Sequence, residues 1–152
     1  MNRLDAIDAT SKYVSERHKV LVLDGIPLDV LLDTVRPDLS LIGLVPTLLD
    51  WFDFPKEQAL VWQRILPPTG CVAVAPVLMC PDDRDLWCSV VVAEVSPEES
   101  VVWWRRLGLD MSKSNPEDMP DAVGTSVEWF SGVGPFCFCR ADYEKCLAEF
   151  RR

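Results

Sequence analysis

The middle of the chain alternates between apolar runs and short acidic segments. Three runs rich in β-branched residues span residues 72–79, 86–95 and 101–107. Runs of this length that are bounded by turn-forming residues are typical of β-strands. The segments between them, residues 81–85 and 96–100, each combine proline with carboxylates. The pattern therefore predicts three sheet strands joined by two acidic turns.

Helices are predicted before these strands, where apolar residues recur at helical spacing. Their expected ranges are residues 3–17, 28–35 and 55–66. Pro55 suits the first turn of the third helix, because its missing N–H is not needed there. Between the first two helices, residues 19–24 are predicted to form a strand that ends in an Asp24-Gly25 turn, and residues 26–28 an edge strand.

The C-terminal part is predicted to contain a polar loop at residues 110–123, a hairpin of residues 126–130 and 134–139, and a final helix at residues 141–151. Helices followed by strands and a closing helix favour an α+β fold over a doubly wound one. We therefore expect a single globular domain over residues 1–152. Its antiparallel sheet should have about five to six strands, with N-terminal helices and a closing C-terminal helix.

The charge of the chain narrows the class of partner. The net charge is −9, and residues 20–139 carry 18 acidic against 7 basic side chains. A field of this sign repels nucleic acid and anionic membranes and attracts cationic partners, although it also simply promotes solubility. The chain starts with charged residues, and no apolar run approaches the roughly 18–20 residues of a membrane span. We expect a cytoplasmic protein with no nucleic-acid or membrane partner.

The chain has six cysteines: Cys71, Cys80, Cys88, Cys137, Cys139 and Cys146. Without a secretion signal, reduced and buried thiols are expected. Cys80 and Cys88 bracket the first acidic turn, so their side chains can approach each other across it. Cys137 and Cys139 share a strand face, over which Cys146 could pack. Thiolates can hold zinc, but these spacings lack CxxC knuckles, so we expect core packing, with no metal and no cofactor.

Three aspartates occupy the first acidic turn: Asp82, Asp83 and Asp85. They lack the twelve-residue register of an EF-hand, so a solvated turn or a partner-binding surface is expected in preference to a cation site. Trp87 follows them directly, and Glu98 and Glu99 form the second acidic turn. These side chains are candidates for contact with a basic partner.

Trp103 and Trp104 are adjacent on one predicted strand, so they face opposite sides of the sheet. The odd-numbered positions of this strand are the more apolar ones, which predicts Trp103 inward and Trp104 outward, near Arg106. An exposed tryptophan beside arginine is typical of binding hot spots, and it would also suit a homodimer contact. The alternative is a second helical layer that covers both faces. Trp87 presents the same two alternatives.

No catalytic motif is present. His18 is the only histidine, and its position at the end of a predicted helix favours a capping or surface role. The chain contains no P-loop, no G-x-G-x-x-G, no G-x-S-x-G elbow and no pairing of cysteine with histidine. Catalysis by two carboxylates in a cleft stays open as an alternative. We expect a protein that is not an enzyme.

Four segments suggest a group of proteins: DGIPLD (24–29), LMCPDDRDLWCSVVVAEV (78–95), WRRLGLD (104–110) and FCFCRADYEKCLAEF (136–150). In style the chain resembles small bacterial immunity proteins that are encoded beside polymorphic or contact-dependent toxins. The resemblance implies an acidic, cytosolic α+β domain that blocks a cognate toxin. Such proteins share no catalytic residues, so the resemblance assigns no role to any residue of this chain.

The leading hypothesis is a non-enzymatic acidic binding protein, specifically an immunity protein that occludes a cognate basic toxin domain. Its predicted partner-binding residues are Asp82, Asp83, Asp85, Trp87, Glu98, Glu99 and Trp104. The alternative hypothesis is a cysteine-based metal-binding or redox protein.

Overall fold

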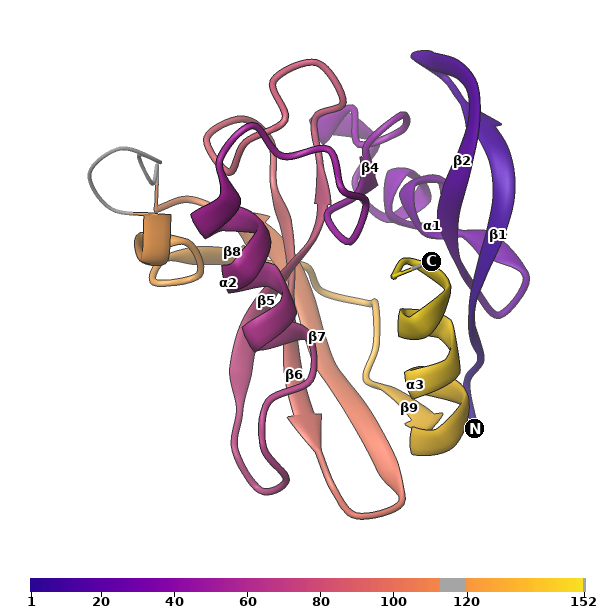
Figure 1. The fold of residues 1–152 in the computed structure, drawn as a ribbon, viewed down its shortest axis with the longest axis vertical. Coiled ribbons are helices and arrows are strands. Elements are labelled where there is room, and N and C mark those ends of the chain that lie inside the picture. The colour runs from indigo at the N-terminus through magenta and orange to yellow at the C-terminus, as the bar shows by residue number, and fades with distance from the viewer. Residues whose placement is uncertain (113–119, 152) are drawn as a thin grey trace.

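The computed structural model describes residues 1–112 and 120–151. In these residues the chain forms an α+β fold with three α-helices and two antiparallel sheets, one of three strands and one of six (Figure 1). The predicted α+β class and the closing helix are confirmed. The predicted loop at residues 110–123 lies partly outside the described residues. No helix in the described part of the chain is long and apolar enough to cross a membrane.

The smaller sheet corrects the prediction of an N-terminal helix. Strand β1 (Leu4–Ser11) pairs antiparallel with β2 (Val14–Leu23), and the short β3 (Ile26–Pro27) forms the far edge after a tight turn at Asp24 and Gly25. Ile7 and Tyr13, two apolar residues within the range predicted as a helix, are exposed. The predicted helix is wrong because pairing with β2 imposes a two-residue period on this segment.

The larger sheet contains the three predicted central strands. Its order is β4 (Val45–Pro46), β5 (Ala73–Met79), β6 (Val91–Pro97), β7 (Val101–Asp110) and β8 (Val127–Trp129), and β9 (Phe136–Cys139) also pairs with β7. Strand β6 begins five residues later than predicted, since residues 86–90 belong to a loop. The predicted hairpin at residues 126–139 is wrong, because β8 and β9 each pair with a different part of β7.

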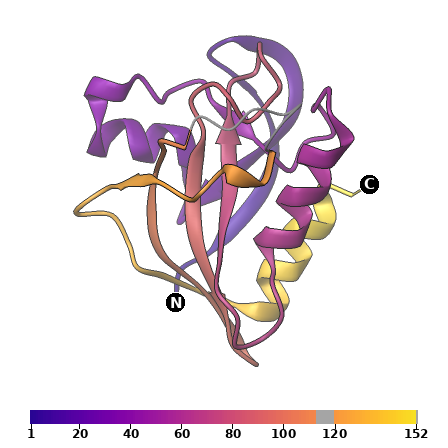
Figure 2. The ribbon, with the colours of Figure 1, turned by 90° about the vertical axis from the view of Figure 1, so that its left-hand side faces the viewer.

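The helices are α1 (Leu28–Val35), α2 (Pro55–Ile65) and α3 (Arg140–Glu149), with short 3₁₀ turns at Pro37–Leu39 and Pro120–Ala122. Helices α2 and α3 are next to each other in the view of Figure 2, and they are joined where the Tyr143 hydroxyl of α3 donates to the Ile65 carbonyl of α2. The main hydrophobic core joins them to both sheets, and α3 packs between the larger sheet and β1. Each of the three helices begins within one residue of a predicted start. The prediction that helices come first in the chain is wrong, because β1, β2 and β3 precede α1.

Trp104 is buried and Trp103 is half-exposed, which reverses the prediction for this pair. Trp104 has 0% exposure and meets the Phe138 ring edge-on at 5.3 Å. The reversal comes from a β-bulge: Ala93 opposes Leu107 and Val95 opposes Trp104, so two residues of β7 face one residue of β6. A bulge shifts the inward and outward parity of the strand beyond it. Leu107 and Trp104 therefore point to the same side.

A buried hydroxyl links β7 to both long helices. The Trp104 indole N–H donates to the Tyr143 oxygen at 3.1 Å, and the Tyr143 hydroxyl donates to the Ile65 carbonyl at 2.7 Å. Burial raises the pKa of Tyr143 well above its usual value, so the hydroxyl keeps its proton and remains a donor. This pair of hydrogen bonds fixes α2 and α3 relative to the sheet.

Replacing Tyr143 with phenylalanine should lower the free energy of unfolding by about 2 kcal/mol, because a buried N–H and a buried carbonyl lose the hydroxyl they share. The ring and its packing are retained. The matched control is Tyr13→Phe, an exposed tyrosine, with an expected change below about 0.5 kcal/mol. Urea denaturation followed by circular dichroism measures both variants. Equal stabilities would contradict the linking role of Tyr143.

Candidate functional site

The structure separates the predicted acidic residues into two groups. Asp82, Asp83, Asp85 and Trp87 lie in the loop between β5 and β6, whereas Glu98 and Glu99 lie in the turn between β6 and β7 (Figure 1). These connections are at opposite ends of β6. A strand of seven residues spans about 23 Å, so the two groups do not form one surface.

Glu98 makes its contacts with other residues of this chain. Its carboxylate accepts the Trp103 indole N–H at 2.8 Å and lies 3.9 Å from the Arg105 guanidinium. Its carbonyl accepts a hydrogen bond from Arg140 at 2.7 Å. The Arg105 guanidinium also lies over the Trp103 ring, at 4.3 Å from its centroid. This turn is thus joined to β7 and α3 by internal contacts, and Glu99 beside it is exposed.

The other group forms a surface that we call the acidic end, defined as residues 50–54 and 80–88. The two segments are in contact, because the Asp53 N–H donates to the Arg84 carbonyl at 3.3 Å and the Arg84 guanidinium lies over the Trp51 ring. These residues include five aspartates and one basic side chain. Trp87 is 51% exposed, and Phe54 is also exposed. The acidic end therefore combines negative charge with accessible aromatic surface.

Within this loop, the aspartates have different environments. Asp82 and Asp83 are exposed, while Asp85 is half-buried and accepts the backbone N–H of Trp87 at 2.9 Å. That bond closes a local turn that holds the backbone of the tryptophan. The same loop thus carries an exposed indole and two exposed carboxylates.

A buried glutamate that sequence reasoning missed anchors the loop to α2. Glu57 has 0% exposure, and one carboxylate oxygen accepts the Leu86 N–H at 2.9 Å. The other oxygen, Oε1, has no hydrogen-bond partner in the described part of the structure. Burial raises the pKa of Glu57 to about 7, against the Leu86 hydrogen bond that lowers it, and Asp85 and Asp53 raise it further. Because it is fully buried, Glu57 is unavailable to a substrate and its role is to hold the loop.

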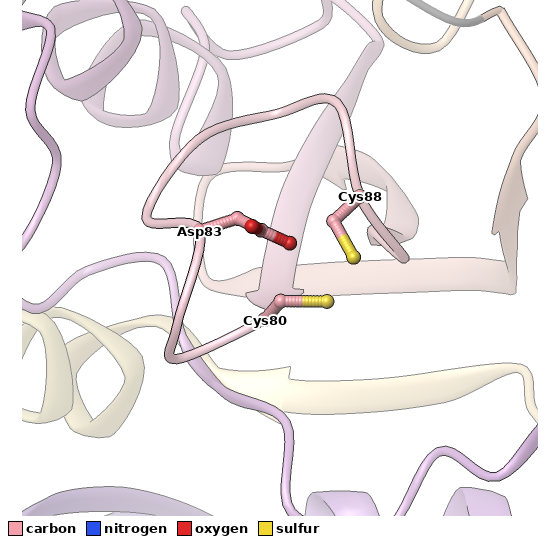
Figure 3. A group of neighbouring side chains, drawn as sticks. All are labelled: Cys80, Asp83 and Cys88. Carbon is pink, nitrogen blue, oxygen red and sulfur yellow. The ribbon is translucent and has the colours of Figure 1, made fainter.

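Two cysteines and an aspartate converge in the same loop (Figure 3). The Cys80 and Cys88 sulfurs and a carboxylate oxygen of Asp83 all lie within 4.8 Å of one another. The expected approach of the two cysteines is confirmed, but the sequence analysis did not place Asp83 with them. Burial raises the pKa of the Cys80 thiol to about 12, and the Cys88 thiol adds to that shift. This is a set of metal-ligating atoms.

The other paired cysteines do not form a comparable set. Cys137 and Cys139 oppose Trp103 and Val101 in the register of β9 with β7. Phe138 between them packs on α3, so strand alternation directs both cysteines to the opposite face. Cys146 is buried in the main core, where burial raises its pKa to about 12. The expectation that Cys146 packs over Cys137 and Cys139 is wrong.

His18 is a core residue, which corrects the prediction of a capping or surface role. It lies on β2, is buried, and its ring centroid is 5.2 Å from that of Trp51. Its Nδ1 is 2.9 Å from the Glu16 carbonyl. The error follows from the helix that was predicted in place of β1 and β2, since no helix ends at His18.

Comparison with protein-family models, curated proteins and solved structures finds no match to this chain. Its function is therefore inferred from the geometry of its own residues. Two features stand out in the described structure, the exposed Trp87 among aspartates and the convergence of Cys80, Asp83 and Cys88. Both belong to the acidic end.

Proposed function

We propose that this chain is a non-enzymatic binding protein whose acidic end covers a basic site on another protein. The observation that carries the proposal is the exposure of Trp87 beside Asp82 and Asp83, on a loop that Glu57 and Asp53 fasten to the body of the protein. Exposed tryptophans dominate the binding energy of many interfaces when they are buried by a partner. The aspartates would draw a cationic partner to the surface and orient it.

The structure narrows the proposed contact set. Trp104 is removed from it, because its side chain is enclosed in the core. Glu98 is engaged internally, and Glu99 lies beside it at the opposite end of β6. The proposed contacts are therefore Asp82, Asp83, Asp85 and Trp87, with Phe54 at the border of the same surface.

The specific form of the proposal is an immunity protein that neutralises a toxin in the cytoplasm. The resemblance in the sequence supports this form, and so does the concentration of carboxylates at one end of the molecule. If the toxin is a nuclease, the aspartates would occupy the positions of nucleic-acid phosphates in its cleft. A homodimer contact through an exposed tryptophan is a second proposal, now centred on Trp87.

The test uses a double variant, Asp82→Lys with Trp87→Ala, and the product of the neighbouring gene as the candidate partner. Affinity measured by calorimetry at low salt is expected to fall at least 100-fold, since both the steering charge and the anchor are lost. Affinity of the unaltered chain should also weaken as salt is raised, because salt screens exposed charges.

The matched control is Glu99→Lys, which makes the same charge reversal at the other end of β6. Its affinity is expected to stay within about threefold of the unaltered chain, because distant exposed charges are screened. Equal losses in the two variants would show that only the overall charge matters. Binding that neither variant changes would remove the acidic end as the contact surface.

A further inference from the structure

The loop between β5 and β6 brings together side chains with the chemistry of a metal site. Cys80 stands just after the end of β5, Asp83 follows it in the turn, and Cys88 lies on the segment that returns toward β6 (Figure 3). Their two sulfurs and a carboxylate oxygen are mutually within 4.8 Å. In the part of the chain that the structure describes, this is the group of at least three histidine, cysteine or carboxylate side chains whose ligand atoms lie this close together.

We propose that Cys80, Asp83 and Cys88 bind a zinc ion through two thiolates and one carboxylate oxygen, leaving a fourth position for water or for a group of another molecule. Zinc binds cysteine sulfur at about 2.3 Å and aspartate oxygen at about 2.0–2.2 Å in a tetrahedron. In that geometry two sulfurs lie about 3.8 Å apart, so the observed separations need to shrink by about 1 Å at most. Rotation of the exposed Asp83 and Cys88 side chains toward the half-buried Cys80 is enough for this.

The backbone of the loop is held in place by contacts that do not involve the three ligands' side chains. The Arg84 N–H points to the Cys80 carbonyl at 3.4 Å, and the Arg84 carbonyl accepts the Asp53 N–H. The Leu86 N–H is bound by the buried Glu57 carboxylate. The ligands are thus carried on a preformed turn, which lowers the ordering cost of binding an ion.

Zinc binding at this site is coupled to the release of protons from the two cysteine thiols. Burial, together with the neighbouring Cys88 thiol, raises the pKa of the Cys80 thiol. Each thiol that binds Zn²⁺ gives up its proton, so two positive charges enter and two protons leave. The affinity is therefore expected to rise with pH. Because binding releases this proton, Cys80 can serve as a ligand although burial raises the pKa of its thiol.

The sequence spacing alone argued against zinc, because C-x7-C is not a familiar knuckle. The folded loop favours zinc, because it brings Asp83 to the two cysteines as a third ligand. The site is a property of this chain by itself and does not depend on the proposed partner. The double variant that tests the partner surface retains Cys80, Asp83 and Cys88, so the two proposals can fail separately.

The experiment is a titration of the full chain, freshly reduced and stripped of metal, with Zn²⁺ against a chromophoric chelator. One equivalent is expected to bind. Co²⁺ used as a spectroscopic substitute should give thiolate charge-transfer bands and the visible absorption of a tetrahedral site. Changing both Cys80 and Cys88 to serine should weaken Zn²⁺ binding at least about 100-fold, and Asp83→Asn about 10-fold.

Two matched controls keep the test specific. Changing Cys137 and Cys139 to serine removes two thiols elsewhere on the sheet, and Asp82→Asn removes a neighbouring carboxylate. Each should leave the Zn²⁺ affinity within about threefold, with unchanged circular dichroism. The proposal would be overturned by binding of less than one equivalent of Zn²⁺ or by Co²⁺ spectra without thiolate bands. It would also be overturned if the cysteine control lost more Zn²⁺ affinity than the Cys80 and Cys88 variant, or if Asp82→Asn lost more than Asp83→Asn.

Discussion

Replacing Trp104 with alanine is expected to lower the free energy of unfolding by about 4 kcal/mol, enough to unfold much of the protein if its stability is ordinary. The indole is fully enclosed, packs edge-on against Phe138 and Tyr143, and donates its N–H to the Tyr143 oxygen. Its removal would leave a cavity where both sheets and α3 meet. Chemical denaturation followed by far-ultraviolet circular dichroism measures the loss without relying on tryptophan fluorescence.

The adjacent residue is a matched control for this prediction. Trp103 is half-exposed, with its N–H on Glu98 and its ring under Arg105. Trp103→Ala should cost only about 1 kcal/mol, since its contacts are near the surface. A larger loss for Trp103 than for Trp104 would mean that the bulge in β7 is misplaced and that the simple alternation of the strand holds.

Replacing Glu57 with glutamine is expected to stabilise the protein at about pH 8 by roughly 2 kcal/mol and to change it little at about pH 4. The amide keeps an oxygen for the Leu86 N–H but carries no charge into the buried position. The unaltered side chain must either ionise in a fully enclosed site or take up a proton.

The direction with pH follows from the raised pKa of Glu57. Folding raises this pKa from 4.5 to about 7, so the folded chain holds the proton more tightly than the unfolded chain does. The stability that this proton contributes is complete below the unfolded pKa and is lost as the pH rises through the folded pKa. The difference in unfolding free energy between Glu57→Gln and the unaltered chain should therefore grow between those two values and level off above them.

The control for this series is Glu99→Gln, an exposed carboxylate in the turn between β6 and β7, for which little change in stability is expected at any pH. Hydrogen exchange at the Leu86 amide gives a local readout, since Glu57 is its acceptor. A stability difference between Glu57→Gln and the unaltered chain that is independent of pH would show that the carboxyl does not titrate in this range.

The three central strands of the larger sheet, β5, β6 and β7, were predictable because their apolar runs are local. The start of β6 was misplaced for a clear reason. Leu86 and Val90 lie in the loop, yet they are buried in a second hydrophobic cluster with Leu60 and Val123. An apolar run therefore continues beyond the strand, and periodicity cannot separate a buried loop from a strand.

The candidate sites were only partly predictable. Asp82, Asp83 and Trp87 were identified by composition, and the structure places them together on one exposed loop. Glu57 gave no signal, since one glutamate in the first turn of a helix is an ordinary surface or capping feature. Its burial depends on a loop that arrives from about thirty residues later in the chain.

The sequence by itself determined the α+β class, the positions of all three helices and the acidic character of the turns. These features follow from spacing and composition within short segments, where each residue acts mainly through its near neighbours. Only the tertiary structure decided that residues 4–23 form a hairpin, that Trp104 is buried and Trp103 is not, and that Cys80, Asp83 and Cys88 meet. Strand pairing, bulges and loop closure depend on partners distant in the chain, and local periodicity carries no information about them.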